Sequence, residues 1–149
     1  MSITAIFDAT AKRCRTLAGL KECYTVTGTA QDDGTLLAIP LSLDSTPVGA
    51  LMPVDGALTA GNTERFLHTF ELQVWLNAAE ANPLSTLAFV DSARVLFRTD
   101  IDAGGTTTRL LMRGYGALRS ETMNSGREYI VLPIRLEALE THFSSDYAV

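Results

Sequence analysis

The side chains that could do chemistry are few in this chain, and they are widely spaced. The histidines are His68 and His142, and the cysteines are Cys14 and Cys23. His68 alternates with phenylalanines along a predicted strand, so we expect a buried, hydrogen-bonded histidine rather than a catalytic base. His142 lies near the C-terminus without an evident partner. A metal site needs several such ligands close together, so no metal is expected.

The two cysteines are predicted to be free thiols. A nucleophilic cysteine needs a histidine or a cationic setting that lowers its pKa. Lys21 near Cys23 is a weak indication of such a setting. Cys14 falls on the apolar stripe of a predicted helix, where a thiol packs as a small hydrophobic group. Two free thiols agree with a chain that is made and kept in a reducing cytoplasm.

Gly104-Gly105, followed by three threonines, superficially suggests a phosphate-binding loop. The GxxxxGK[ST] spacing is absent, however, and no helix is predicted to begin there. A flexible loop before a strand is the better interpretation. We therefore expect no catalytic residue and no cofactor, and a protein that is not an enzyme.

Composition narrows the class of protein further. At 149 residues the chain is expected to form a single domain. Its net charge of −5 argues against nucleic-acid binding driven by phosphate contacts, which needs a basic surface, and no sequence-specific nucleic-acid partner is expected. The basic side chains are ten arginines and two lysines, a bias found at protein interfaces and also in proteins from GC-rich genomes. The start of the chain carries Asp8 and no continuous apolar run, so neither a signal peptide nor a membrane span is predicted.

The clearest element is a strand over residues 65–76, because apolar and polar residues alternate there with period 2. Apolar residues at i, i+3, i+4 and i+7 predict two helices, one over residues 3–18 and one over residues 84–99. Gly19 is expected to end the first helix. The second helix is expected to begin at Ser85 as N-cap, or alternatively at Asn82-Pro83, and to turn Arg94 and Arg98 outward. The other predicted elements are a short strand over 21–27 and a hairpin with arms 106–118 and 128–139 turning near 124–126.

The faces of two predicted strands follow from the same alternation. In the first strand one face carries Phe66, His68, Phe70, Leu72, Val74 and Leu76, and the other Arg65, Thr69, Glu71 and Gln73. In the last hairpin arm Pro133 indicates that one side lacks a strand neighbour, because proline cannot donate a hydrogen bond to a ladder.

Residues 28–63 are the hardest part of the chain to assign. Leu36–Ile39 and Pro47–Pro53 are predicted as strand edges, each next to a proline. Residues 55–63 hold two glycines and no strand pattern, which predicts a long loop. We expect this loop, from Asp55 to Asn62, to contact a partner rather than the core. The tail over 142–149 is expected to fray.

Arginines gather along the predicted hairpin. Arg109 and Arg113 share one face of the first arm, and Arg119 follows them. Such a cluster is either a solvated face or a surface that pairs with carboxylates of another subunit. We expect at least one of these arginines to pair across a subunit boundary.

Five segments stand out in the order in which they follow one another along the chain. They are AGLKECY at 18–24, GALMP at 49–53, HTFELQVWL at 68–76, the helix with Phe89 and Phe97, and YIVLPIRL at 129–136. In their order and pattern, over about residues 3–140, they resemble the lambda-type tail terminator family of long-tailed bacteriophages. The first of them is similar to the recurrent "Gly–Val–Lys–x–Val–Tyr" of that family.

The resemblance implies an α+β fold, with a largely antiparallel mixed sheet of about four to five strands covered by two helices. It implies a homo-hexameric ring that caps the tail tube protein, stops tube growth and offers a docking face to the head completion and connector proteins. The protein would then lie in the virion, at the head–tail interface, with genome DNA passing through the ring. Other head–tail joining proteins fit the same pattern. A small ligand-binding domain or enzyme is a further alternative, with His68 and either Glu71 or Tyr24 as polar groups of an apolar pocket.

Overall fold

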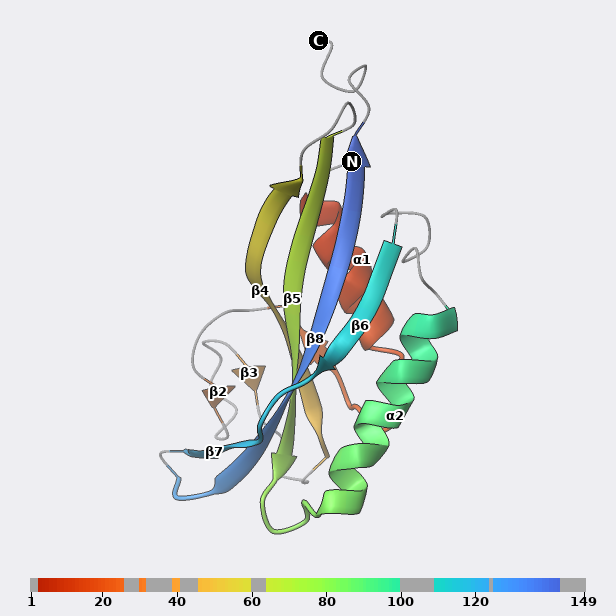
Figure 1. The fold of residues 1–149 in the computed structure, drawn as a ribbon. Helices are drawn as coiled ribbons and strands as arrows, with labels where there is room; N and C mark the ends of the chain where they lie inside the picture. Colours follow the sequence, from red (N-terminus) through yellow and green to blue (C-terminus); the bar gives the residue numbers. More distant parts are fainter. Residues whose placement is uncertain are drawn as a thin grey trace.

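Two helices cover one face of a six-stranded sheet in the computed structural model of this protein (Figure 1). The model describes residues 3–25, 30–31, 39–40, 46–59, 64–99, 109–123 and 125–142. This confirms the predicted α+β class, with more strands in the sheet than expected. The elements are α1 (Ile3–Cys14), β1 (Cys23–Tyr24), β2 (Ala30–Gln31), β3 (Ile39–Pro40), β4 (Val48–Thr59), β5 (Glu64–Asn77), α2 (Pro83–Thr99), β6 (Arg109–Tyr115), β7 (Arg119–Thr122) and β8 (Glu128–His142).

The main sheet has the strand order β1-β4-β5-β8-β6, and β7 also pairs with β8. The only parallel pairing among its described strands is that of β1 with β4. The strands β2 and β3 form a separate parallel pair. At the centre, β5 and β8 pair without interruption from Glu64 opposite His142 to Asn77 opposite Tyr129. This long antiparallel pair is the scaffold on which the remaining strands are placed.

The main core lies between the sheet and the helices, on what we call the inner face. β5 contributes Phe70, Leu72 and Val74, which are at most 1% exposed. Alternate residues of β8 meet them, and Phe7 of α1 packs edge-on against Phe70 with 5.2 Å between ring centroids. From α2, a buried face of Phe89, Val90, Ala93 and Phe97 completes the layer, with the spacing of one side of a helix.

The opposite, outer face of the sheet carries a second and smaller apolar cluster, which the sequence reading missed. Trp75 and Tyr129 meet edge-on there with centroids 6.3 Å apart. Gln73, expected on a polar face, is only 6% exposed and accepts a hydrogen bond from Trp75 Nε1 at 3.3 Å. The cluster consists of Val48, Ala50, Trp75, Tyr129 and Val131.

The boundaries of both helices differ from expectation in an instructive way. α1 ends at Cys14, four residues before the predicted end, and the chain continues in turns to Gly19, whose φ of +91° suits glycine. Backbone hydrogen bonds between residues three apart, such as Leu17 N–H to Cys14 O at 3.0 Å, replace the α-helical pattern of bonds between residues four apart. α2 begins at Pro83, the alternative that we left open. Asn82 is the N-cap, and its Oδ1 accepts a hydrogen bond from the backbone N–H of Ser85 at 2.9 Å.

The prediction of a loop over residues 55–63 was wrong in its first half. β4 continues to Thr59 and pairs with β5 along its whole length, with one β-bulge at Val54 between Pro53 and Asp55. Pairing with the long β5 strand outweighs the weak strand propensity of the glycine-containing segment, because cross-strand contacts stabilise a strand beyond its own propensity. Asn62 lies outside the described residues, as do most of residues 26–45 and all of 143–149.

The predicted hairpin is confirmed, but its first arm is broken into β6 and β7. Leu132 and Pro133 lie at the break, between the β6 pairing that ends at Ile134 and the β7 pairing that begins at Val131. The N–H of Gly116 still donates to the Pro133 carbonyl at 2.9 Å. The expectation that Pro133 lacks a strand neighbour on one side is therefore confirmed. A second bulge, at Arg113, precedes the break.

In the part of the chain that the structure describes, no helix is long and apolar enough to cross a membrane.

Candidate interaction surfaces

His68 and Glu140 form an acid–base pair that is buried on the inner face. His68 Nε2 lies 2.8 Å from Glu140 Oε2, and the side chains are 3% and 7% exposed. The imidazole stacks on the Phe66 ring at 4.6 Å between centroids. Glu71 is an odd-numbered neighbour on β5, so it lies on the outer face and does not join His68. The pair predicted for a ligand pocket is thus divided between the two faces.

The sequence reading did not foresee that the two cysteines meet. Cys14 at the end of α1 and Cys23 in β1 are both fully buried and hydrogen-bonded to each other. That hydrogen bond, together with burial, raises the pKa of the Cys14 thiol well above its usual value. Accepting the same bond lowers the pKa of Cys23, and the nearby Arg15 acts in the same direction. The thiols are packed into the core, so they hold α1 against β1 rather than face a substrate.

Within the described ranges, no three histidine, cysteine or acidic side chains come close enough to bind a metal ion.

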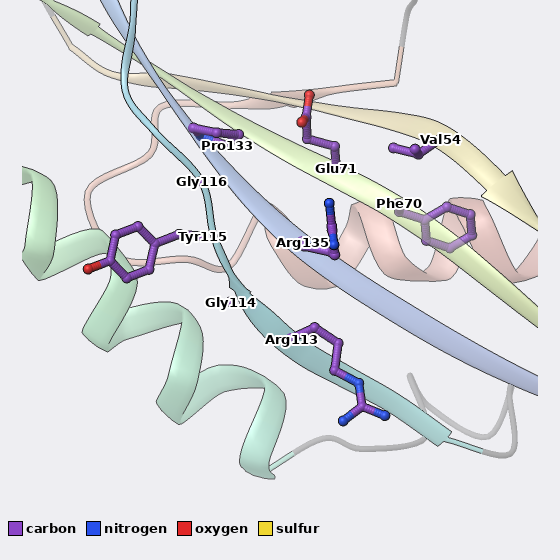
Figure 2. Close-up of a pocket in the computed structure, with 9 residues that line it drawn as sticks. All are labelled: Val54, Phe70, Glu71, Arg113, Gly114, Tyr115, Gly116, Pro133 and Arg135. Carbon is purple, nitrogen blue, oxygen red and sulfur yellow. The ribbon is translucent and has the colours of Figure 1, made fainter.

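The outer face carries a cavity of about 250 Å³ near its centre, lined by both charged and apolar side chains (Figure 2). Glu71 is held by Gln73, whose Nε2 donates to its Oε2 at 2.8 Å. Arg135 stands directly opposite Glu71 on the neighbouring strand. At the side of the cavity Arg113 Nε makes an ion pair with Glu137 Oε2 at 2.9 Å. This cavity is small and open, and its charges are of both signs.

One margin of the sheet is the open edge of β4. β1 covers β4 only at Gly49 and Ala50, and no other described strand pairs with that side of β4. Residues 53–58 are exposed on both faces. Among them, Val54 and Leu58 leave 55% and 57% of their surfaces in water. An unpaired, partly apolar strand edge is a ready site for pairing with another chain.

The other margin is β6, and it has a different chemistry. No described strand pairs with the far side of β6, and a hollow of about 380 Å³ lies between it and the second half of α2. Three of the lining residues are exposed arginines, while the others are apolar. We call this hollow the β6–α2 groove; it is lined by Arg94, Phe97, Arg98, Arg109, Leu111 and Met112.

The charge of the groove stands out against the rest of the molecule. The whole chain has a net charge of −5. Of the groove arginines, Arg94 has Asp91 nearby, at a loose 3.7 Å on the exposed surface of the same helix. Figure 1 shows β4 at one margin of the sheet and β6, with α2 beside it, at the other. The protein thus presents an acidic-to-neutral edge and a basic edge at opposite margins.

No protein-family model matches this chain, and no curated protein matches it in sequence. Any functional assignment therefore rests on the surfaces described above and on the pattern of the sequence.

The residues predicted to form an interface are distributed over both margins. Asp55 is exposed on β4, Arg109 is exposed at the start of β6, and Arg119 is exposed on β7. Arg113 is exposed too, but it already has Glu137 as an intramolecular partner. The sequence reading placed Arg94 and Arg98 on the outward face of a helix and did not connect them with Arg109. Only the packing of α2 beside β6 brings the three together.

Proposed function

We propose that this protein is a structural subunit of a bacteriophage tail, a tail terminator that forms a ring on the end of the tail tube. The pattern of its sequence resembles that family over most of the chain. One structural observation supports the ring most directly. Among the strands that the structure describes, the main sheet has two open edges, and they differ in shape and charge.

Two different edges favour a contact in which each copy uses one edge toward each neighbour. Such head-to-tail contacts generate a closed ring when the rotation between copies closes, and an open filament when it does not. A terminator needs the closed case, because its ring must stop on the last ring of tube subunits. The expected assembly is a homo-hexamer, with the tube on one face, the head completion and connector proteins on the other, and the genome passing through the centre.

Another head–tail joining protein is the nearest alternative, since it would use the same kind of ring. A ligand-binding domain is a more distant one, and its support is the cavity beside Arg135 on the outer face. That cavity, of about 250 Å³, is below the usual range for small-molecule sites, about 300–1,000 Å³, and the β6–α2 groove, of about 380 Å³, is an open hollow along a strand edge rather than an enclosed site. The ring is therefore the better-supported proposal.

The experiment is a capping assay with the tail tube protein of the same phage. Polymerising tubes are mixed with increasing amounts of this protein, and tube lengths and ends are measured by negative-stain electron microscopy. A terminator shortens the tubes and adds a ring at one end. Unchanged tube lengths with bare ends at saturating protein would contradict the proposal, and binding to head connectors without an effect on tubes would favour another joining protein.

A further inference from the structure

The two open edges lie at the same height on the sheet, which the register shows. Asp55 of β4 is opposite Thr69, which is opposite Glu137 and then Leu111 of β6. Two residues further along, Ala57 is connected in the same way to Arg109. A rotation about an axis along the strands keeps these heights. It would therefore bring residues 55–57 of one copy beside residues 109–111 of the next.

The strand directions also suit such a rotation. Three antiparallel pairings separate β4 from β6, so the two edge strands run in opposite directions. Rotation about an axis along the strands preserves each direction, so β6 of one copy would meet β4 of the next in antiparallel fashion. A two-fold axis would instead place two identical edges together.

Both edges carry features that restrict where another strand can pair. The bulge at Val54 and the neighbouring Pro53 interrupt β4, and the bulge at Arg113 interrupts β6. Bulges and edge prolines are common protections against indiscriminate strand pairing. Both bulges lie beyond the same end of the two edge segments. Residues 55–58 and 109–112 are therefore regular strand, and pairing between copies would stop at the bulges.

The side chains on the two segments are complementary. Asp55 lies opposite Thr69 of β5, and Arg109 lies opposite Leu139 of β8. The odd-numbered residues of β5 and β8 belong to the outer face, so Asp55 and Arg109 lie on that face too. β4 carries Asp55 and no basic residue, whereas the groove presents Arg94, Arg98 and Arg109.

On the inner face, the exposed Leu58 side chain has an apolar counterpart in the groove. It lies opposite Phe66 in β5, one residue beyond the level of Arg109, and Phe97 of α2 lines the groove. A neighbouring strand seated on β6 would cover these groups and remove Leu58 from water.

We propose, resting on the ring described above, that subunits join by adding residues 55–57 of β4 to residues 109–111 of β6 in the next copy. Asp55, which is level with Leu111, pairs with the groove arginines, chiefly Arg109, which lies two residues along on the same face. Leu58 enters the β6–α2 groove. The occupant of the groove is thus a second copy of this chain, and the ring carries one sheet that is continued from subunit to subunit.

Cross-linking between introduced cysteines tests the direction of the contact. Asp55→Cys and Arg109→Cys are made singly and together and treated with a short bis-maleimide, with and without tail tubes. The native cysteines are buried, so untreated background is low and the wild type is the control. The double variant is expected to give a ladder that extends beyond dimers on a denaturing gel. Each single variant alone is expected to stay monomeric, and a mixture of the two single variants is expected to give dimers only.

Charge exchange tests the chemistry of the same contact. Asp55→Arg and Arg109→Asp are each expected to raise the protein concentration needed for half-assembly by at least about thirtyfold, measured by analytical ultracentrifugation. The combined variant is expected to recover to within about threefold of the wild type, because the pair is restored with opposite polarity. Asp8→Arg and Lys12→Asp, on the exposed side of α1, are matched controls that should not change assembly. Circular dichroism melting verifies that each variant is folded.

Several outcomes would overturn the inference. Dimers from a single cysteine variant would indicate a two-fold contact, and no ladder in any condition would exclude this pair of edges. A polyanion such as single-stranded DNA that protects Arg109→Cys from maleimide, while a second copy does not, would assign the groove to nucleic acid. The capping assay reports separately on the function: tubes capped by protein that gives no ladder would remove this contact and leave the terminator role intact. Ladders from protein that leaves tubes uncapped would do the reverse.

Discussion

At the scale of single residues, the environment of His68 explains why an ionisable pair is found in the core. Its Nε2 donates to Glu140 Oε2, since an ionised carboxylate only accepts hydrogen bonds. Phe66 and Phe70 flank the imidazole on its own strand, with ring planes within 17° and 6° of its plane. The buried Nδ1 has no hydrogen-bond partner among the described residues. The pair is therefore specific in geometry, and its removal leaves a polar group buried without compensation.

Replacing Glu140 by alanine should lower the free energy of unfolding by about 1–3 kcal/mol, because His68 loses the acceptor of its buried hydrogen bond. Glu140→Gln keeps an acceptor oxygen of similar shape and should cost less than Glu140→Ala. Urea denaturation followed by tryptophan fluorescence measures both, with Trp75 as the probe. Equal and negligible losses for the two variants would mean that the hydrogen bond contributes nothing to stability.

At the scale of elements, the end of β4 depends on a glycine. Gly56 lies opposite His68, and a Cβ atom added there would stand 2.6 Å from Phe66 Cε1. That separation is far below contact distance, so the Phe66 ring would have to leave its stack on His68. The absence of a side chain at Gly56 thus allows the aromatic stack and the edge strand to coexist.

Gly56→Ala is accordingly expected to destabilise the protein by about 1–3 kcal/mol through overpacking. Phe66→Leu in the same chain should recover part of this loss, because the smaller side chain makes room for the new methyl group. A double-mutant cycle of thermal or urea unfolding separates the coupling from the single effects. Additive losses would show that the two side chains do not compete for this space.

At the scale of the whole molecule, the arginines of the hairpin region should differ in their effect on assembly. Arg109→Ala should cost about 2–5 kcal/mol of association, because it leaves the neighbour's Asp55 in a covered contact without its partner. Arg113→Ala and Arg119→Ala should each cost under about 1 kcal/mol, since Arg113 has an exposed partner in its own chain and Arg119 lies on β7, beyond the break.

Sedimentation velocity at several protein concentrations gives the association constants of the three variants. The association constant of the wild type is also measured at increasing sodium chloride concentration, because salt weakens pairs between exposed charges. If Arg119→Ala disperses the rings and Arg109→Ala does not, the contact lies at the β7 end of the sheet.

Local features of the chain are the ones that the sequence by itself determined. The alternation in β5, the apolar face of α2, the Asn82-Pro83 start, Gly19 as a left-handed residue and the interrupted pairing at Pro133 all depend on neighbours within a few positions. Backbone dihedral preferences and side-chain period are properties of short segments, so they can be read without the fold.

Only the tertiary structure decided the features that depend on residues far apart in the chain. The extension of β4 through Asp55 needs β5 as a partner, the Cys14–Cys23 contact needs α1 to return to β1, and the burial of Trp75 needs Tyr129 on β8. The β6–α2 groove likewise exists because a helix and a strand, separated by residues 100–108, pack side by side. Long-range strand pairing and packing outweigh local propensity, so the position and the charge of the two open edges appear only in the folded chain.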